Sequence, residues 1–76
     1  MSASVFTIWA RVLADEGGFF TAVVSAVPVH TNTLAEVRSL ACDSRQDALT
    51  MLDPMARVLG TELMSRGDLV ASVEFP

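Results

Sequence analysis

The sequence offers few of the side chains that catalysis, metal binding or covalent cross-linking requires. Cys42 is its one cysteine, His30 is its one histidine, and lysine is absent, so all 5 basic residues are arginines. A single cysteine excludes an internal disulfide and a cluster of thiolate metal ligands. Charged residues make up only 18% of the chain. The longest stretch of low charge, residues 17–35, contains Pro28 and alternates like a strand, so we do not expect it to span a membrane.

His30 and Cys42 also lack the neighbours that a catalytic role needs. A catalytic histidine requires an orienting carboxylate and a nucleophile within hydrogen-bond reach, and His30 is followed by threonine and asparagine only. Asp43 disfavours a thiolate at Cys42, although a helix that begins close by would favour one. We interpret His30 as a solvated loop residue and Cys42 as a small buried residue. The sequence therefore predicts no catalytic residue, no cofactor and no metal, and substitutions at either position should leave activity nearly unchanged.

Apolar and acidic side chains are what the sequence has in excess. Hydrophobic residues make up 51% of the chain, and its 9 acids outnumber its 5 bases, which gives a net charge of −4. An acidic chain repels a phosphate backbone, so direct nucleic-acid binding is not expected. The same charge would speed the encounter with a basic protein, although solubility alone also explains it.

The length of 76 residues fits one domain, residues 1–76. A chain this short has a thin stability margin, which self-association would widen. A secretory signal needs a basic start and an uninterrupted apolar stretch. Arg11, Asp15 and Glu16 interrupt the apolar stretch near the start, so we expect a cytoplasmic protein.

A β-hairpin is the clearest local pattern. Residues 5–14 alternate like a strand, and residues 19–27 are rich in β-branched and aromatic side chains. Asp15 and Glu16 lead into Gly17 and Gly18 between the two runs, and adjacent glycines supply the positive φ angles of a tight turn. Because these glycines join two strands and open no helix, they do not predict a phosphate-binding loop.

A third strand is predicted over residues 33–42, after Pro28 has ended the second. Glu36 and Arg38 lie on one face of it, together with Leu40. Charged side chains on a strand are typical of a sheet edge that must not adhere to other chains. We therefore expect this strand to be near an edge and more exposed than the hairpin.

A helix is predicted to begin after Ser44 and to run to about Met64, before Gly67. Ser44 and Asp47 have the spacing of a capping box. Pro54 costs an internal hydrogen bond, so we expect a helix that is kinked there or restarts with Asp53 as a cap. The apolar residues that follow one another at helical spacing and are expected to face the core are Ala48, Leu52, Met55, Leu59 and Leu63.

Residues 68–75 alternate again as a last strand. The predicted fold is α+β with the order β-β-β-α-β: a three-stranded antiparallel meander plus a C-terminal strand, with one helix on one face. The sequence leaves the pairing of the last strand open, and a parallel pairing would require a right-handed crossover.

The sheet face away from the helix is expected to be partly apolar. If Phe6 and Ile8 face the helix, the opposite face of the sheet has no cover in a one-helix domain. We predict a homodimer or larger assembly, because an apolar face of this kind is usually covered by another chain. The residues expected at this oligomer interface are Trp9, Arg11, Leu13, Phe19 and Val23.

Three acidic residues are expected to contact a basic partner. Asp15 and Glu16 lie at the tip of the hairpin, and Glu36 is expected on the exposed side of the third strand. Charge reversal at Asp15 and Glu16 should slow association and leave the fold intact, because turns usually tolerate such changes. The alternative is that these side chains only keep the hairpin soluble.

The segment from Phe6 to Leu59 resembles a HicB-type antitoxin domain. The resemblance rests on an acidic-glycine hairpin (residues 14–20), on a second strand that ends at Pro28, and on a strand that leads through Ser44 into a helix. It implies the partial ribonuclease H-like fold of that family, which lacks a working active site. Residues 6–12 accordingly contain no acid that could hold a metal for two-metal hydrolysis.

The resemblance also implies a function. HicB-type antitoxins bind a small basic RNA-cleaving toxin, cover its active face and assemble as dimers or larger species. Two other readings stay open on the residues alone. One is a phage- or plasmid-encoded acidic inhibitor of a nucleic-acid-handling complex. The other is a structural or ligand-binding module that dimerises through its uncovered sheet face.

Overall fold

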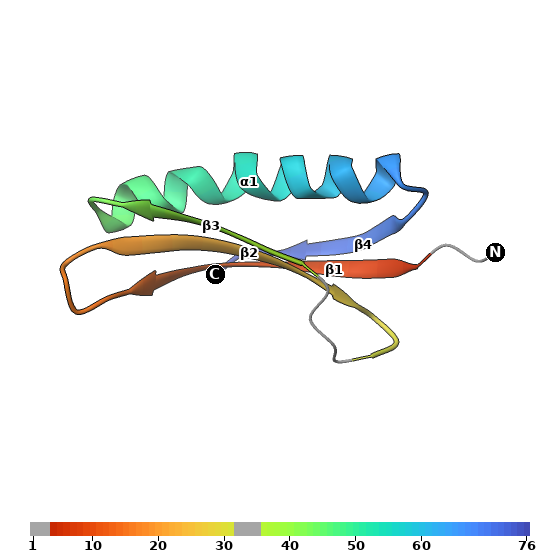
Figure 1. The fold of residues 1–76 in the computed structure, drawn as a ribbon, viewed down its shortest axis with the longest axis horizontal. Coiled ribbons are helices and arrows are strands. Elements are labelled where there is room, and N and C mark those ends of the chain that lie inside the picture. Colours follow the sequence, from red (N-terminus) through yellow and green to blue (C-terminus); the bar gives the residue numbers. More distant parts are fainter. Residues whose placement is uncertain (1–3, 32–35) are drawn as a thin grey trace.

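The computed structural model describes residues 4–31 and 36–76, and it confirms the α+β fold and the β-β-β-α-β order (Figure 1). Four strands form one sheet, and one helix connects the third strand to the fourth. The elements are β1 (Val5–Ala14), β2 (Phe20–Pro28), β3 (Glu36–Cys42), α1 (Arg45–Ser65) and β4 (Leu69–Glu74). The predicted start of the third strand, residues 33–35, lies outside the described residues.

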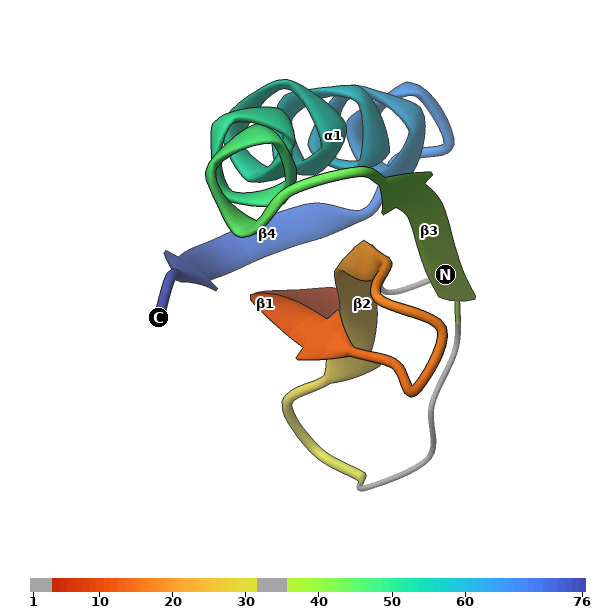
Figure 2. The same ribbon diagram turned by 90° about the vertical axis from the view of Figure 1, so that its left-hand side faces the viewer.

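The sheet is mixed, with the strand order β3-β2-β1-β4. β1 and β2 pair antiparallel, β2 and β3 pair antiparallel, and β4 pairs parallel with β1. The third strand is therefore an edge strand, as predicted, and the last strand forms the other edge. α1 lies along one face of the sheet, with β3 on one side of it and β4 on the other (Figure 2).

The hairpin turn is closed by the side chain of Asp15. Its Oδ1 accepts hydrogen bonds from the backbone N–H of Gly17 at 2.7 Å and of Phe19 at 3.2 Å. Gly18 has a φ of 87°, a left-handed conformation that side chains with a Cβ rarely adopt. Asp15 therefore stabilises the turn through its side chain, a role that the sequence analysis, which expected Asp15 to contact a basic partner, did not include.

The core lies between the sheet and α1. Phe6, Ile8 and Ala10 alternate inward along β1 and are buried. The residues of β2 that lie opposite them on the same face are small, with Ala26 beside Ile8 and Val24 beside Ala10. Because these side chains are short, the helix can approach the sheet closely.

α1 is one continuous helix through Pro54, so of the two alternatives expected there, a kink or a restart with Asp53 as a cap, the restart is excluded. Its start is as expected, because the Ser44 hydroxyl accepts a hydrogen bond from the N–H of Asp47 at 3.1 Å. Pro54 has no backbone N–H, so the Thr50 carbonyl, four residues earlier, lacks its usual intrahelical hydrogen bond. Both residues are exposed, so this carbonyl can accept a hydrogen bond from water instead.

The apolar stripe of α1 differs from the prediction at one position. Met55 is only partly buried, and Ala56 takes the central place over the sheet at 3% exposure. The physical reason is the close approach of helix and sheet, which leaves room for Ala56 and Gly60 but moves the long Met55 side chain to the flank. The other expected residues are buried: Ala48, Leu52, Leu59 and Leu63.

β4 contains an irregularity that sequence alternation does not predict. Phe6 pairs with Val70 while the next residue, Thr7, pairs with Ser72, so Ala71 is an extra residue in β4. This bulge puts Val70 and Val73, three positions apart, on the helix side, and both pack against the core.

Candidate protein-binding surfaces

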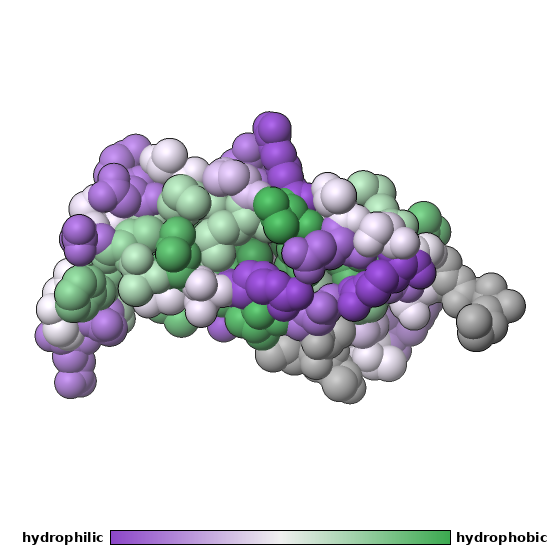
Figure 3. Space-filling view, turned by 45° about the horizontal axis from the view of Figure 1, so that its top comes forward, coloured by the Kyte–Doolittle hydropathy of each residue, from purple (hydrophilic) through white to green (hydrophobic). Residues whose placement is uncertain are grey.

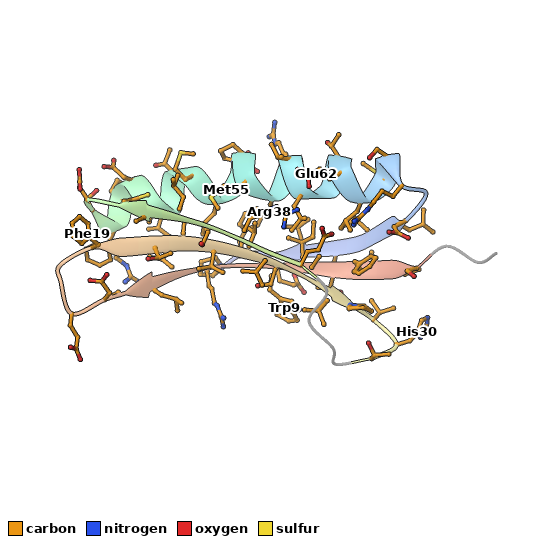
Figure 4. The ribbon with its side chains drawn as sticks, in the orientation of Figure 1. Trp9, Phe19, His30, Arg38, Met55 and Glu62 are labelled. Carbon is orange, nitrogen blue, oxygen red and sulfur yellow. The ribbon has the colours of Figure 1, made fainter. Side chains whose placement is uncertain are left out.

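The sheet face opposite α1 carries most of the residues predicted for the oligomer interface. Trp9 is 51% exposed and points away from α1 (Figure 4). Leu13, which is 46% exposed, and Arg11 lie on the same open face, because they alternate with the buried side chains of β1. Val23 is on the same face but is only 6% exposed, because it lies in a central strand between Arg11 and Ser39. Phe19 is exposed at the hairpin end and precedes β2.

Polar side chains separate the apolar ones on the open face. Across the strands, the exposed Trp9 and Val37 flank Ser25, which is in register with both and is only 8% exposed. The next row consists of Arg11, Val23 and Ser39. The open face therefore presents the apolar side chains of Trp9, Leu13 and Val37 with the exposed polar side chains of Arg11 and Ser39 beside them, a composition that suits contact with another protein.

The structure does not bring the three predicted acids together. Glu16 and Asp15 lie at the hairpin end, next to the Cys42 end of β3, because Phe20 pairs with Cys42. Glu36 begins β3 at its other end, six residues away, or about 20 Å at the rise of a strand.

Two acids that are not among the predicted partner contacts join the hairpin end. Asp43 follows β3, and Asp47 lies in the first turn of α1. With Asp15 and Glu16 they form what we call the acidic end, where Arg45 is the one basic residue. Asp43 and Asp47 are about 30 positions from Asp15 and Glu16 in the sequence, so the sequence alone does not predict this group. The pairing of β2 with β3 brings the two pairs of acids to the same end of the sheet.

Glu36 is on the helix side of the sheet, so its expected place on the exposed side is wrong. The reason is the register, which puts Glu36 opposite Ala26 and Arg38 opposite Val24, both on the face that α1 covers. On that side the Glu36 carboxylate accepts hydrogen bonds from Arg38 at 3.2 Å and from both terminal nitrogens of Arg66.

This ion-pair network continues to the helix. Arg38 also donates to Glu62 of α1 at 3.0 Å, so Arg38 lies between two carboxylates (Figure 4). The hydrogen bond from Arg66 lowers the pKa of Glu36 below its ordinary value of 4.5, and Arg38 adds to this effect while partial burial opposes it. Glu62 raises the pKa of Arg38, and Glu36 raises the pKa of Arg66. The network fixes the last turns of α1 to the start of β3.

Two apolar grooves flank the helix. Four strands at about 4.8 Å spacing make a sheet roughly 19 Å wide, whereas a helix with its side chains is about 10–12 Å across. One helix therefore cannot cover both outer strands. The groove between α1 and β4 has a volume of about 400 Å³, and its lining includes Gly60, Met64, Val73 and Phe75.

The groove on the other side of α1, about 260 Å³, is the methionine groove. Its lining consists of Met51, Pro54, Met55 and Val58 with Arg38 and Glu62 at its polar end. Figure 3 shows apolar surface gathered along the helix and toward the β3 edge, beside charged side chains. Sequence periodicity reveals neither groove, because both depend on how far the sheet extends beyond the helix.

The two residues weighed as catalytic candidates are at separate places. His30 is exposed after β2, and Cys42 ends β3, where it packs against the edge of the core. Among residues 4–31 and 36–76, no group of three or more His, Cys, Asp or Glu side chains is placed to hold a metal ion. Within the same ranges no helix has both the length and the apolar character that crossing a membrane requires.

Comparison of the chain with protein-family models, with curated proteins and with solved structures found no match. The resemblance to HicB-type antitoxins remains an expectation from the sequence motifs.

Proposed function

We propose that this chain is a protein-binding inhibitor, antitoxin-like in its mode of action, that covers a basic nucleic-acid-processing protein. The observation that carries the proposal is the open sheet face, on which Trp9 is 51% exposed and Leu69 is 55% exposed. Half-exposed tryptophan and leucine side chains between polar groups are the type of anchor that protein interfaces use.

The acidic end supports a basic partner. Glu16 and Asp43 are exposed there, and no hydrogen bond or ion pair involves either carboxylate among the contacts of the described residues. Carboxylates that are not neutralised locally attract a basic surface and raise the association rate. An inhibitor of a nucleic-acid-processing protein would place these groups where phosphates otherwise bind.

A capture experiment with two matched variants tests this proposal. Immobilised wild-type protein is incubated with an extract of its native host, in parallel with Trp9→Ser and with Met64→Ser. Met64 is a suitable control because it is 58% exposed, as Trp9 is at 51%, but lies in the groove beside β4. Bound proteins are quantified by mass spectrometry.

The proposal predicts one basic protein that the wild type and Met64→Ser retain and that Trp9→Ser loses. Purified, that protein should cleave or otherwise process nucleic acid, and wild-type chain should inhibit it. A partner with no nucleic-acid chemistry, or equal retention by all three baits, would contradict the proposal.

A further inference from the structure

The two edges of the sheet are protected to different degrees. β4 carries a bulge at Ala71, ends at Glu74 and precedes Pro76, and bulges, charges and prolines are features that prevent an edge from pairing. β3 has neither a bulge nor a proline: all seven of its residues, Glu36–Cys42, pair with β2 in an unbroken register. In the part of the chain that the structure describes, β2 is the one strand that pairs with β3.

The charges on β3 do not protect it either. Glu36 and Arg38 are the only charged residues of the strand, and they are held by each other, by Glu62 and by Arg66 on the helix side. The last four residues of β3, from Ser39 to Cys42, are uncharged, and Leu40 is 42% exposed. A regular, uncharged and exposed edge is a template for another strand.

We propose that β3 is the pairing edge of a symmetric homodimer, in which two copies join their β3 strands antiparallel and form one eight-stranded sheet. Pairing about Ser39 uses all seven residues of both strands. Such an interface is self-complementary, as a two-fold axis requires, because each copy contributes the same edge.

Charge favours the antiparallel orientation. The Cys42 end of β3 adjoins the acidic end, whose four acids outnumber Arg45. At the Glu36 end, Arg38 and Arg66 are ion-paired with Glu36, Glu62 and Asp68, so this end carries less excess negative charge. Antiparallel pairing puts the acidic end of each copy next to the more nearly neutral end of the other, whereas parallel pairing would bring the two acidic ends together, where they repel.

The same arrangement covers the methionine groove. Leu40 and the groove lie on the helix side of β3, because Leu40 pairs with Ala22 on the core face. Two-fold pairing through β3 puts both helices on one side of the joined sheet, with the two methionine grooves facing each other. Met55 and Val58 of both copies would then be removed from water, and the gain in apolar burial adds to the new backbone hydrogen bonds.

Light scattering on the wild type and on three variants tests the assignment. Leu40→Lys puts a charge on the β3 edge without changing the core, and Leu69→Lys is the matched control on the β4 edge. Trp9→Ser reports on the open face, which we predicted as the oligomer interface. We expect twice the mass of one chain for the wild type, for Leu69→Lys and for Trp9→Ser, and the mass of one chain for Leu40→Lys. A monomeric wild type, or a dimer that Leu40→Lys retains, would overturn the proposal.

Cross-linking tests the register. In a Cys42→Ser background, Ser39→Cys puts two thiols directly opposite each other at the two-fold axis, where the Cα separation of about 4.5–5.5 Å suits a disulfide. Oxidation should convert this variant to a covalent dimer. Ser72→Cys, also exposed but on β4, should remain uncross-linked in the same background. Cross-linking of Ser72→Cys in place of Ser39→Cys would show that β4 is the pairing edge. Neither result depends on the partner proposed above, because a failure of that proposal would appear in the capture experiment alone.

Discussion

Arg66 and Glu36 are 30 positions apart in the sequence, yet they form two side-chain hydrogen bonds that join the end of α1 to the first residue of β3. Arg38 and Glu62 extend the contact, so helix, edge strand and charge network form one unit. The proposed pairing edge is therefore held in place by ion pairs between its own charges and those of Glu62 and Arg66.

This network makes stability depend on pH. The pKa of Glu36 is lower in the folded chain than its ordinary value of 4.5, chiefly because of the hydrogen bond from Arg66. A lowered pKa means that the contribution of Glu36 to stability is complete above about pH 4.5 and is lost as the pH falls through the folded-state value. The groups that face Glu36 are Arg66 and Arg38, with Glu62 and Asp68 beyond them.

The corresponding measurement is thermal unfolding of wild type and Glu36→Gln across this pH range. We expect the variant to unfold at a lower temperature at neutral pH, and the difference to shrink below pH 4.5 as the wild-type carboxylate becomes protonated. Asp53→Asn is the control, because Asp53 pairs with Arg57 in an exposed position where an ion pair contributes little. A difference that is constant with pH would contradict this role for Glu36.

Truncation of the core stripe should be costly. Leu59 is fully buried between α1 and the sheet, and Leu52 is 2% exposed. Either one changed to alanine should lower the free energy of unfolding by about 2–5 kcal/mol, through lost burial and the cavity that remains. Leu49→Ala, on the same helix but 39% exposed, should have a much smaller effect. Urea unfolding of the three variants measures this, and similar losses for all three would show that the stripe is wrongly assigned.

Gly60 offers the opposite prediction. A Cβ at this buried position would lie 3.7 Å from the Ile8 side chain and 3.9 Å from Val70, which is ordinary van der Waals contact. Gly60→Ala should therefore stabilise the helix by about 0.5–1 kcal/mol, since alanine is the better helix former and loses less backbone entropy on folding. Gly67→Ala should be destabilising, because Gly67 has a φ of 88°. A lower unfolding midpoint for Gly60→Ala would mean that the helix lies closer to the sheet than described.

Local features of the fold could be read from the sequence, and long-range ones could not. The hairpin, the Ser44 cap and the end of α1 near Gly67 depend on neighbouring residues, so the pattern predicts them. The burial of Ala56 in place of Met55 depends on the small side chains of β2, which are far away in the sequence. The sheet face on which Glu36 lies, and the set of acids that forms the acidic end, likewise follow from strand pairing.

The structure also changes the design of the charge experiment. Asp15 accepts two backbone hydrogen bonds in the turn, so its reversal would disturb the hairpin as well as the charge. Glu16 and Asp43 are exposed and can be reversed with less effect on the fold. Asp53→Lys is the matched control, because it makes the same change in net charge at the middle of α1, away from the acidic end.

The measurement that tests the central claim most directly is the association rate of the captured basic partner with wild type, Glu16→Lys, Asp43→Lys and Asp53→Lys. It is made by stopped flow at about 0.01 M and about 0.15 M salt, where the Debye lengths are roughly 30 Å and 8 Å. We expect a wild-type association rate that falls steeply with salt, lower rates for Glu16→Lys and Asp43→Lys at low salt, and a nearly wild-type rate for Asp53→Lys, with dissociation little changed. An association rate that does not depend on salt, or equal effects of all three reversals, would contradict the claim that the acidic end guides a basic partner to this protein.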